Sequence, residues 1–465
     1  MWLKIINLDK PKTVVQFLKI FIMINKLFQL SKRMFSLTLF IMLFMGLVGM
    51  PEASGFFQEP QEQNQNYTQY KGKIMDSDSK KPLVFATLSI EDTNISTISN
   101  TEGEFILKVP NTIEEGNVLI SYLGYKTKLL PLSQFNSNNN KIYMVISVVE
   151  LSEVSLSIPK DAESLVRETL KKRGQNYFDD PTLMTAFYRE TIKKRKKNVS
   201  LSEAVVNIYK TPYTSSRRDA VQLYKARKST DYSKLDTIAL KLQGGPFNAL
   251  FVDIMKYPEY IFEQNSLDKY NFSYDRSTKV KDRHIYVVSF VQKPTVYEQL
   301  YQGKLYIDAE NKILTSAIYS LNITNKNEAS KLFVRRKPRN AKVWPNEVAY
   351  RVDYREKDGR WYYGYSNVLL EFKINWDKKL FNSVYSMTCE MAVTDWEKNI
   401  SKEMPKSKER IKTSIILGDE AIGFADPDFW GEYNIIEPEK SIESAIRKIR
   451  RQLKKGKLDD GTSAP

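Results

Sequence analysis

The chain has 465 residues, of which 42% are hydrophobic and 12% aromatic, so it can bury more than one core and is not wholly disordered. Its net charge of +16 is uneven: residues 56–158 carry −4 and residues 159–465 carry +15, which predicts an anionic partner for the second part. One histidine and one cysteine exclude multi-histidine metal sites and intramolecular disulfides.

Residues 1–55 have the pattern of an export leader. An uncharged apolar run, residues 34–50, follows Lys26, Lys32 and Arg33 and precedes the small residues 53–55. This three-part arrangement indicates a secretory signal peptide. The run also approaches the length of a membrane-spanning helix, so an uncleaved membrane anchor is the alternative. The sequence does not identify which methionine starts translation.

Residues 56–69 are rich in glutamine and asparagine and are interpreted as a polar linker. Residues 70–157 then contain short strand-like runs separated by turns. The expected strands lie within 70–76, 82–90, 120–126 and 141–149, with turns at 76–82 and 100–103. The spacing predicts an all-β sandwich.

Residues 158–436 predict a second, larger domain. Asp161 is expected to cap a helix that ends near Gly174, and residues 246–255 to form a helical interruption. Apolar residues otherwise alternate with polar ones, which predicts strands at 185–192, 201–209, 220–224, 285–290, 303–308, 313–321, 347–354, 361–374 and 385–396. We expect hairpin turns at 308–312 and 193–197, and a large antiparallel curved sheet or half-barrel of the α+β class.

Residues 437–465 predict a basic amphipathic helix and tail, with Pro438 at the helix start. Two basic groups are candidate contacts for an anionic surface: Arg335, Arg336 and Lys337, and on this helix Arg447, Lys448, Arg450 and Arg451. The alternative for the helix is packing on its own domain through Ile442, Ile446, Ile449 and Leu453.

Several residues of the first domain carry a resemblance: Gly72, Asp76, Pro82, Ala86, Thr87, Gly103, Phe105 and the run 121–125. They resemble the carboxypeptidase regulatory-like domain, a transthyretin-like β-sandwich without an active site of its own. The whole chain is similar to envelope proteins of Gram-negative bacteria that join this module to a β-rich domain, through residues 187–190, 303–308 and 428–434. The run 303–308 also resembles periplasmic lipoprotein-carrier half-barrels. These resemblances imply a location in the periplasm or at the periplasmic face of the outer membrane.

The residues needed for common catalytic sites are missing. A zinc peptidase needs two histidines, and only His284 is present; we interpret it as structural, and Cys389 as a core residue. The sequence has no Gly-x-Ser-x-Gly elbow, P-loop or dinucleotide-binding motif. We therefore predict no catalytic residues, no metal and no cofactor.

One acidic group keeps an enzymatic alternative open. Asp426, Asp428 and Glu432 surround Trp430, an arrangement that suits either a sugar-stacking site or a packed aromatic anchor.

The leading hypothesis is a non-enzymatic exported envelope protein that acts by binding or assembly, with an unknown ligand. Its expected partners are an anionic lipid or lipopolysaccharide surface or another envelope protein, and not nucleic acid. The alternatives are a half-barrel carrier of a lipid or other apolar ligand and a carboxylate-based glycan hydrolase.

Overall fold

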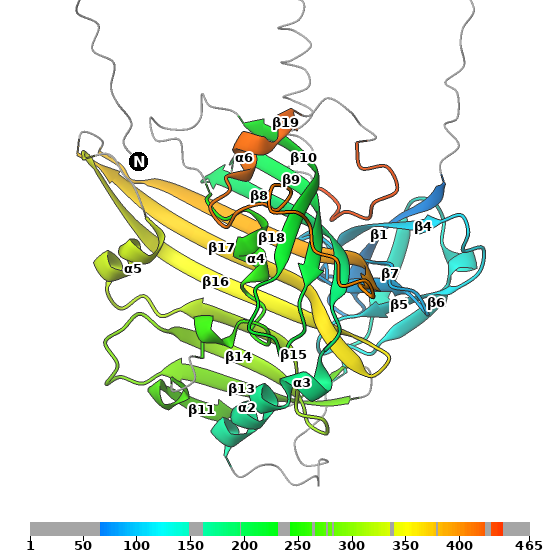
Figure 1. Ribbon diagram of the computed structural model, residues 1–465, viewed down its shortest axis with the longest axis horizontal. Coiled ribbons are helices and arrows are strands. Elements are labelled where there is room, and N and C mark those ends of the chain that lie inside the picture. Colours follow the sequence, from blue (N-terminus) through cyan, green and yellow to red (C-terminus); the bar gives the residue numbers. More distant parts are fainter. Residues whose placement is uncertain are drawn as a thin grey trace, which may run out of the picture. The chain divides into compact units, whose positions relative to one another are not determined.

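The computed structural model describes residues 66–147, 161–195, 197–230, 242–262, 266–275, 278–280, 283–334, 339–377, 380–423 and 429–439 (Figure 1). All of them belong to one compact unit, residues 65–465. The predicted leader, signal peptide and most of the linker lie outside the described residues, as does nearly all of the predicted C-terminal helix.

The first seven strands form a β-sandwich. They are β1 (Tyr67–Asp76), β2 (Thr87–Ile90), β3 (Ser96–Ile98), β4 (Glu104–Pro110), β5 (Asn117–Ser121), β6 (Lys128–Pro131) and β7 (Asn140–Met144), with a 3-10 turn η1 (Leu132–Gln134). One sheet has the order β4-β1-β7 and the other β3-β2-β5-β6. The two sheets enclose a core that includes Ile74, Leu88, Phe105 and Ile120. Gly103, at φ +75° in the turn before β4, leaves no room for a side chain against the Ile74 carbonyl.

The remaining strands of the described residues form one 12-stranded sheet. They are β8 (Thr182–Lys194), β9 (Lys197–Lys210), β10 (Ala220–Thr230), β11 (Tyr270–Tyr274), β12 (Thr278–Val280), β13 (Arg283–Gln292), β14 (Tyr301–Asp308), β15 (Ile313–Leu321), β16 (Ala341–Lys357), β17 (Arg360–Trp376), β18 (Ser383–Lys398) and β19 (Ile422–Gly423). The order is β11-β13-β14-β15-β16-β17-β18-β8-β9-β10-β19, with β12 beside β13. All pairings are antiparallel except β10 with β19.

One face of the large sheet carries short helices and the main core. The helices are α2 (Ala162–Lys171), α3 (Arg173–Asn176), α4 (Pro246–Leu250), α5 (Lys326–Phe333) and α6 (Leu417–Glu420), with 3-10 turns η4 (Pro258–Tyr260) and η5 (Leu267–Lys269). α4 packs on β17 and β18, and α2 packs near β11. Phe247, Leu250 and Met255 are buried on this face, because alternate strand residues such as Tyr188 point toward them.

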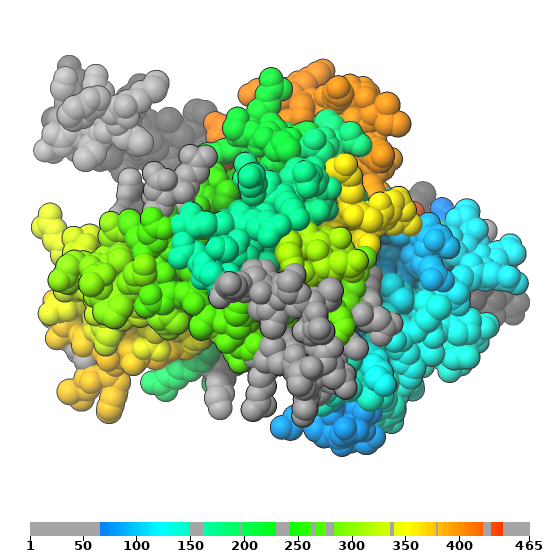
Figure 2. Space-filling model, turned by 90° about the horizontal axis from the view of Figure 1, so that it is seen from below, coloured from blue at the N-terminus to red at the C-terminus, as the bar shows by residue number. Residues whose placement is uncertain are grey.

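The opposite face of the large sheet meets the sandwich. A second apolar cluster joins Ile98 and Ile106 of the sandwich to Phe187 and Val205 of the sheet and to Trp430. Figure 2 shows the blue and cyan surface of the sandwich beside the yellow surface of the β16–β17 region. The period-two alternation of the long strands thus provides two different packing surfaces.

The structure confirms the predicted class, an N-terminal β-sandwich followed by a larger antiparallel curved sheet. Asp161 caps α2 by accepting from the backbone N–H groups of Glu163 and Ser164, as predicted. The expected strand at 82–90 is shorter: Thr87–Ile90 forms β2, and Pro82 makes an isolated bridge to Met75. Residues 122–125 form a turn after β5. The strands β11 and β12 and the helix α5 were not predicted. Their short, mixed sequences lack a clear period.

Candidate functional site

The seven cations that the sequence predicts as anionic-surface contacts all lie outside the described residues: Arg335, Arg336, Lys337, Arg447, Lys448, Arg450 and Arg451. In the sequence, the first three belong to the connection between α5 and β16. Two of the three acidic residues near Trp430, Asp426 and Asp428, also lie outside the described residues.

Residues 429–439, here called the strap, hold the sandwich against the large sheet. Trp430 is 3% exposed and stacks edge-on against Phe187, with ring centroids 5.3 Å apart. Asn434 exchanges two hydrogen bonds with the backbone of Lys108 in β4, at 2.8 and 2.9 Å. Trp430 is therefore a packed anchor and offers no face for sugar stacking, which resolves the two interpretations of this segment.

Beneath the strap, a ladder of alternating charges crosses four neighbouring strands. Arg189 of β8 donates to Glu203 of β9 at 2.7 Å and to Glu390 of β18 at 3.2 Å. Arg227 of β10 lies 2.8 Å from the other carboxylate oxygen of Glu203. Arg189 also donates to the Ile436 carbonyl at 2.7 Å. Burial alone would lower the pKa of Arg189, but the two carboxylates outweigh it and raise the pKa. This cluster is internally neutral and fully bonded.

A second buried ion cluster lies on the helix-bearing face of the sheet. Lys210 Nζ lies 2.8 Å from Asp219 and 2.6 Å from Asp253, and all three side chains are at most 2% exposed. Tyr257 donates to Asp219 at 2.8 Å and Tyr354 donates to Asp253 at 3.0 Å. Each charged group in the two clusters has an ion-pair or hydrogen-bond partner beside it. We therefore interpret both clusters as structural.

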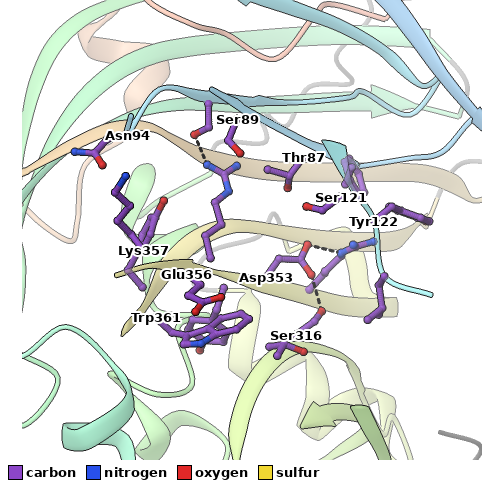
Figure 3. A pocket seen from close by; sticks show the side chains of 18 of the residues that line it. Thr87, Ser89, Asn94, Ser121, Tyr122, Ser316, Asp353, Glu356, Lys357 and Trp361 are labelled. Atoms are coloured by element: carbon purple, nitrogen blue, oxygen red, sulfur yellow. Dashed lines mark hydrogen bonds and ion pairs between the residues drawn. The ribbon is translucent and has the colours of Figure 1, made fainter. Parts of the chain in front are cut away.

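A cleft of about 130 Å³ opens where the sandwich meets β15, β16 and β17. Its sandwich wall carries short polar and aromatic side chains, and its sheet wall carries charged and aromatic ones (Figure 3). The labelled lining residues are Thr87, Ser89, Asn94, Ser121 and Tyr122 above, and Ser316, Asp353, Glu356, Lys357 and Trp361 below. The walls are held together by Asn94, which donates to the Trp396 carbonyl of β18 at 2.6 Å.

Arg355 of β16 is the least compensated charge in this cleft. Its Nη1 donates to the Ser96 hydroxyl of the sandwich and, at 2.7 Å, to the Val393 carbonyl of β18; both acceptors are neutral. Its Nη2 is shielded from solvent and makes no hydrogen bond with the described residues. Burial lowers the pKa of the guanidinium, and Tyr362 and Asp353 offset this only in part. No carboxylate of the described residues forms an ion pair with it.

The other charged residues of the cleft differ in how far they are engaged. Asp353 accepts from Arg351 at 2.7 Å and from the Ser316 hydroxyl at 2.5 Å. Burial would lower the pKa of Arg351, but Asp353 reverses this and raises it. Glu356 is held by Arg283 at 2.7 Å, outside the lining set. Lys357 makes no ion pair with the described residues, so the cleft has an excess of positive charge.

The cleft also contains an indole donor without an acceptor. Trp361 is 5% exposed, and its Nε1 is buried and makes no hydrogen bond with the described residues. Two buried donors in one lining, from Arg355 and Trp361, are unusual because buried polar groups are normally paired. The cavity is smaller than the clefts that hold drug-sized molecules, so it suits a small group or the end of a larger molecule. The geometry can therefore bind an oxyanion through donated hydrogen bonds.

The sequence reasoning predicted the strand that carries these residues but not the site. A signal was present: Arg351, Asp353 and Arg355 alternate along one strand, so that one face of the strand is charged. The covering partner is the sandwich, more than 200 residues earlier in the chain, and no local pattern identifies it.

Among the described residues, no three His, Cys, Asp or Glu side chains are grouped so that they could hold a metal ion. Within the same ranges, no helix has both the length and the apolar character required to cross a bilayer.

One comparison with known proteins identifies the first domain. No curated protein matches the chain. Three solved structures are similar over about half of the chain: a DUF1329 family protein from Desulfovibrio piger (9% identity, 52% of this chain and 95% of that chain, TM-score 0.23), a putative outer membrane lipoprotein-sorting protein domain from Vibrio parahaemolyticus (9%, 53% and 95%, 0.24) and a LolA superfamily protein from Nitrosomonas europaea (9%, 52% and 96%, 0.22). The model of the CarboxypepD_reg-like domain matches residues 70–156. The sandwich that forms the upper wall of the cleft is thus a CarboxypepD_reg-like domain.

Proposed function

We propose that this chain is a non-enzymatic, exported envelope protein that binds a carboxylate-bearing ligand in the cleft between the sandwich and the large sheet. The observation that carries the proposal is the guanidinium of Arg355, whose Nη2 is shielded from solvent and has no acceptor among the described residues. A cation that is shielded from water and has no carboxylate partner destabilises the folded protein. A carboxylate of a ligand would pair with it and offset this cost.

A carboxylate fits the cleft better than a neutral group does. Arg355 and Lys357 are lining cations that form no ion pair with the residues that the structure describes, whereas Arg351 is neutralised by Asp353. The planar fork of a guanidinium matches a carboxylate, and the Trp361 indole adds a further donor. The ring of serine and threonine hydroxyls on the sandwich wall can bond the remainder of the ligand. The same chemistry is found in a peptide C-terminus and in an acidic sugar.

Two observations favour this proposal over the alternatives. On the helix-bearing face of the sheet, where a half-barrel carrier would hold an apolar ligand, Phe247, Leu250 and Met255 fill the space among the described residues. For a glycan hydrolase, the two cleft carboxylates would have to be available for proton transfer, but Asp353 and Glu356 are each engaged by an arginine.

Calorimetric titration with matched probe pairs tests the ligand class. The pairs are a short peptide with a free C-terminus against its amide, and glucuronate against glucose. We expect one acid to bind and its neutral partner not to bind. In Arg355→Gln, binding of that acid should be roughly 10- to 100-fold weaker, the range for one lost charged hydrogen bond. Arg217→Gln, an exposed arginine outside the cleft, is the control and should bind normally.

Equal affinity for the acid and its neutral partner, or full affinity in Arg355→Gln, would contradict the proposal. Cell fractionation tests the location separately. We expect the protein in the periplasmic or outer-membrane fraction, and its recovery in the cytosol would refute export whatever the titrations give.

A further inference from the structure

Three connections of the large sheet lie together at one end. The β8–β9 turn touches the start of β18, because Arg195 N–H donates to the Val384 carbonyl at 2.9 Å. The β17–β18 connection touches the start of β16, because Asp377 N–H donates to the Asn340 carbonyl at 3.1 Å. The sheet order β16-β17-β18-β8-β9 therefore places the β17–β18 connection between the other two (Figure 1). This end is called the tip.

The β17–β18 connection presents two large apolar side chains to solvent. Leu380 is 97% exposed and Phe381 is 78% exposed, and they are adjacent in the chain. On the neighbouring α5, Leu332 is 59% exposed. Scattered exposed apolar residues are normal, but two consecutive ones at the extreme end of a hairpin indicate a contact surface.

The tip is strongly cationic. Arg195 and Lys197 of the β8–β9 turn and Arg339 and Lys342 at the start of β16 are exposed. Among the described residues of the three connections, Lys193, Lys194, Arg195, Lys197 and Arg339 are basic and Asp377 is acidic. Lys193 pairs with Glu439 of the strap at 3.5 Å. An apolar protrusion with a basic rim matches a surface that is anionic outside and apolar beneath, which is the interface of an anionic lipid bilayer.

The opposite end of β18 provides a contrast within the same strand. Ile400 is 88% exposed and lies between Lys398 and Lys402, so an apolar side chain and cations occur there as well. However, Lys398 pairs with Asp180 at 3.5 Å, and acidic residues such as Glu397 and Glu403 balance the charge. Of these two ends, the tip combines an adjacent exposed apolar pair with four exposed cations, Arg195, Lys197, Arg339 and Lys342, that form no ion pair with the described residues.

We propose that the tip of the large sheet docks on an anionic lipid surface, with Leu380 and Phe381 entering the interface and the basic rim contacting the head groups. This inference does not depend on the cleft or on its ligand. It assigns the two ends of the sheet different partners: the sandwich end a small oxyanion and the tip a membrane surface.

Co-sedimentation of the full chain with vesicles tests the docking. The vesicles are phosphatidylcholine alone, and phosphatidylcholine mixed with phosphatidylglycerol. We expect binding to the mixed vesicles only. Arg195→Glu with Lys197→Glu should weaken it by roughly 25-fold, at about fivefold for each basic residue. Leu380→Ser with Phe381→Ser should weaken it by at least about tenfold. The control, Ile400→Ser with Lys402→Glu at the opposite end, should bind like the wild type.

A site-specific probe separates docking of the tip from insertion of any other part of the chain. An environment-sensitive fluorophore is attached to Phe381→Cys; the native Cys389 is buried and does not compete. Its emission should shift to the blue on mixed vesicles, and the same label on Ile400→Cys should not shift. The proposal is overturned if the Phe381→Cys label remains water-exposed on bound vesicles, or if neutral vesicles bind equally. It also fails if the tip variants bind as tightly as the control, or if a soluble protein or nucleic acid competes with the vesicles for the same residues.

Discussion

Arg189 and Arg355 both lie between the large sheet and the elements that cover it, Arg189 fully buried and Arg355 half-buried, but their surroundings differ. Arg189 has a carboxylate on the strand at each side, Glu203 and Glu390, and a strap carbonyl above. Among the described residues, Arg355 has a hydroxyl and a carbonyl as acceptors for Nη1 and no acceptor for Nη2. The guanidinium of Arg189 thus has carboxylate partners within the protein, whereas that of Arg355 lacks them among the described residues.

The difference separates framework from candidate site better than burial does. A completed buried ion cluster fixes the register of four strands and has no capacity left for a ligand. A buried charged group that lacks an acceptor lowers the free energy of unfolding of the free protein. A ligand that supplies the missing acceptor raises it again. The following substitutions test this distinction, from the largest expected effect to the smallest.

Replacing Arg189 by methionine should be the most damaging change. It leaves Glu390 without its cation and Glu203 with only Arg227 in a site that excludes water. We expect a loss of about 3–5 kcal/mol in the free energy of unfolding, the range for breaking a buried ion pair. Urea denaturation followed by circular dichroism measures it. A loss below about 1 kcal/mol would mean that the ladder is not part of the framework.

Replacing Trp430 by alanine should uncover the same ladder. The indole ring lies 4.7 Å from the Arg227 guanidinium and packs on Phe187, so its removal costs roughly 3 kcal/mol and admits water. We further expect faster proteolysis in the connection between the sandwich and α2, because the strap no longer holds the sandwich. Phe429→Ala, which removes a less buried strap ring, is the control and should cost less.

Glu190 extends the comparison to a buried carboxyl group that forms no ion pair with any described residue. Burial raises its pKa to about 7, although it accepts from the Tyr188 hydroxyl at 3.0 Å. The folded protein therefore binds a proton that the unfolded chain releases near pH 4.5, and stability falls as the pH rises from about 4.5 to 7. Glu190→Gln should remove this slope and be roughly 3 kcal/mol more stable than wild type at pH 8, with little difference at pH 4. Thermal melts of the wild type and Glu190→Gln between pH 4 and pH 8 measure this difference. The same pH dependence of stability in both proteins would contradict a raised pKa of Glu190.

Replacing Arg355 by methionine should change stability least. Ser96 still donates to the Val393 carbonyl at 3.2 Å, and no carboxylate is left unpaired. We expect the free energy of unfolding to change by less than about 1 kcal/mol, in contrast to Arg189→Met. A loss as large as that of Arg189→Met would show that Arg355 belongs to the framework and would remove the main support for a ligand site.

The local structure was largely predictable from the sequence. Alternating residues identified the long strands, and Asp308 turns the β14–β15 hairpin by accepting from the backbone N–H groups of Glu310 and Asn311. His284 lies at the start of β13 and Cys389 is buried in β18, as expected. These features depend on neighbours in the chain, where the sequence pattern is informative.

The candidate site was not predictable for a physical reason. The alternating pattern of β16 predicts which residues lie on each of its two faces. It does not predict which part of the chain packs on each face. Arg355 is incomplete only because the sandwich, some 260 residues earlier, excludes water and supplies a hydroxyl without a carboxylate. In the same way, the tip exists only because the sheet order brings three separate connections together.

The two hydrogen bonds between Asn434 and Lys108 span 326 residues. At ordinary rates of synthesis, the ribosome needs between about 16 and 65 s to make the second partner after the first. For that interval the apolar residues Ile98 and Ile106 have no permanent cover. The junction can therefore be assembled only after the C-terminal part of the chain has been made, and until then these residues add to an apolar surface that is prone to aggregation.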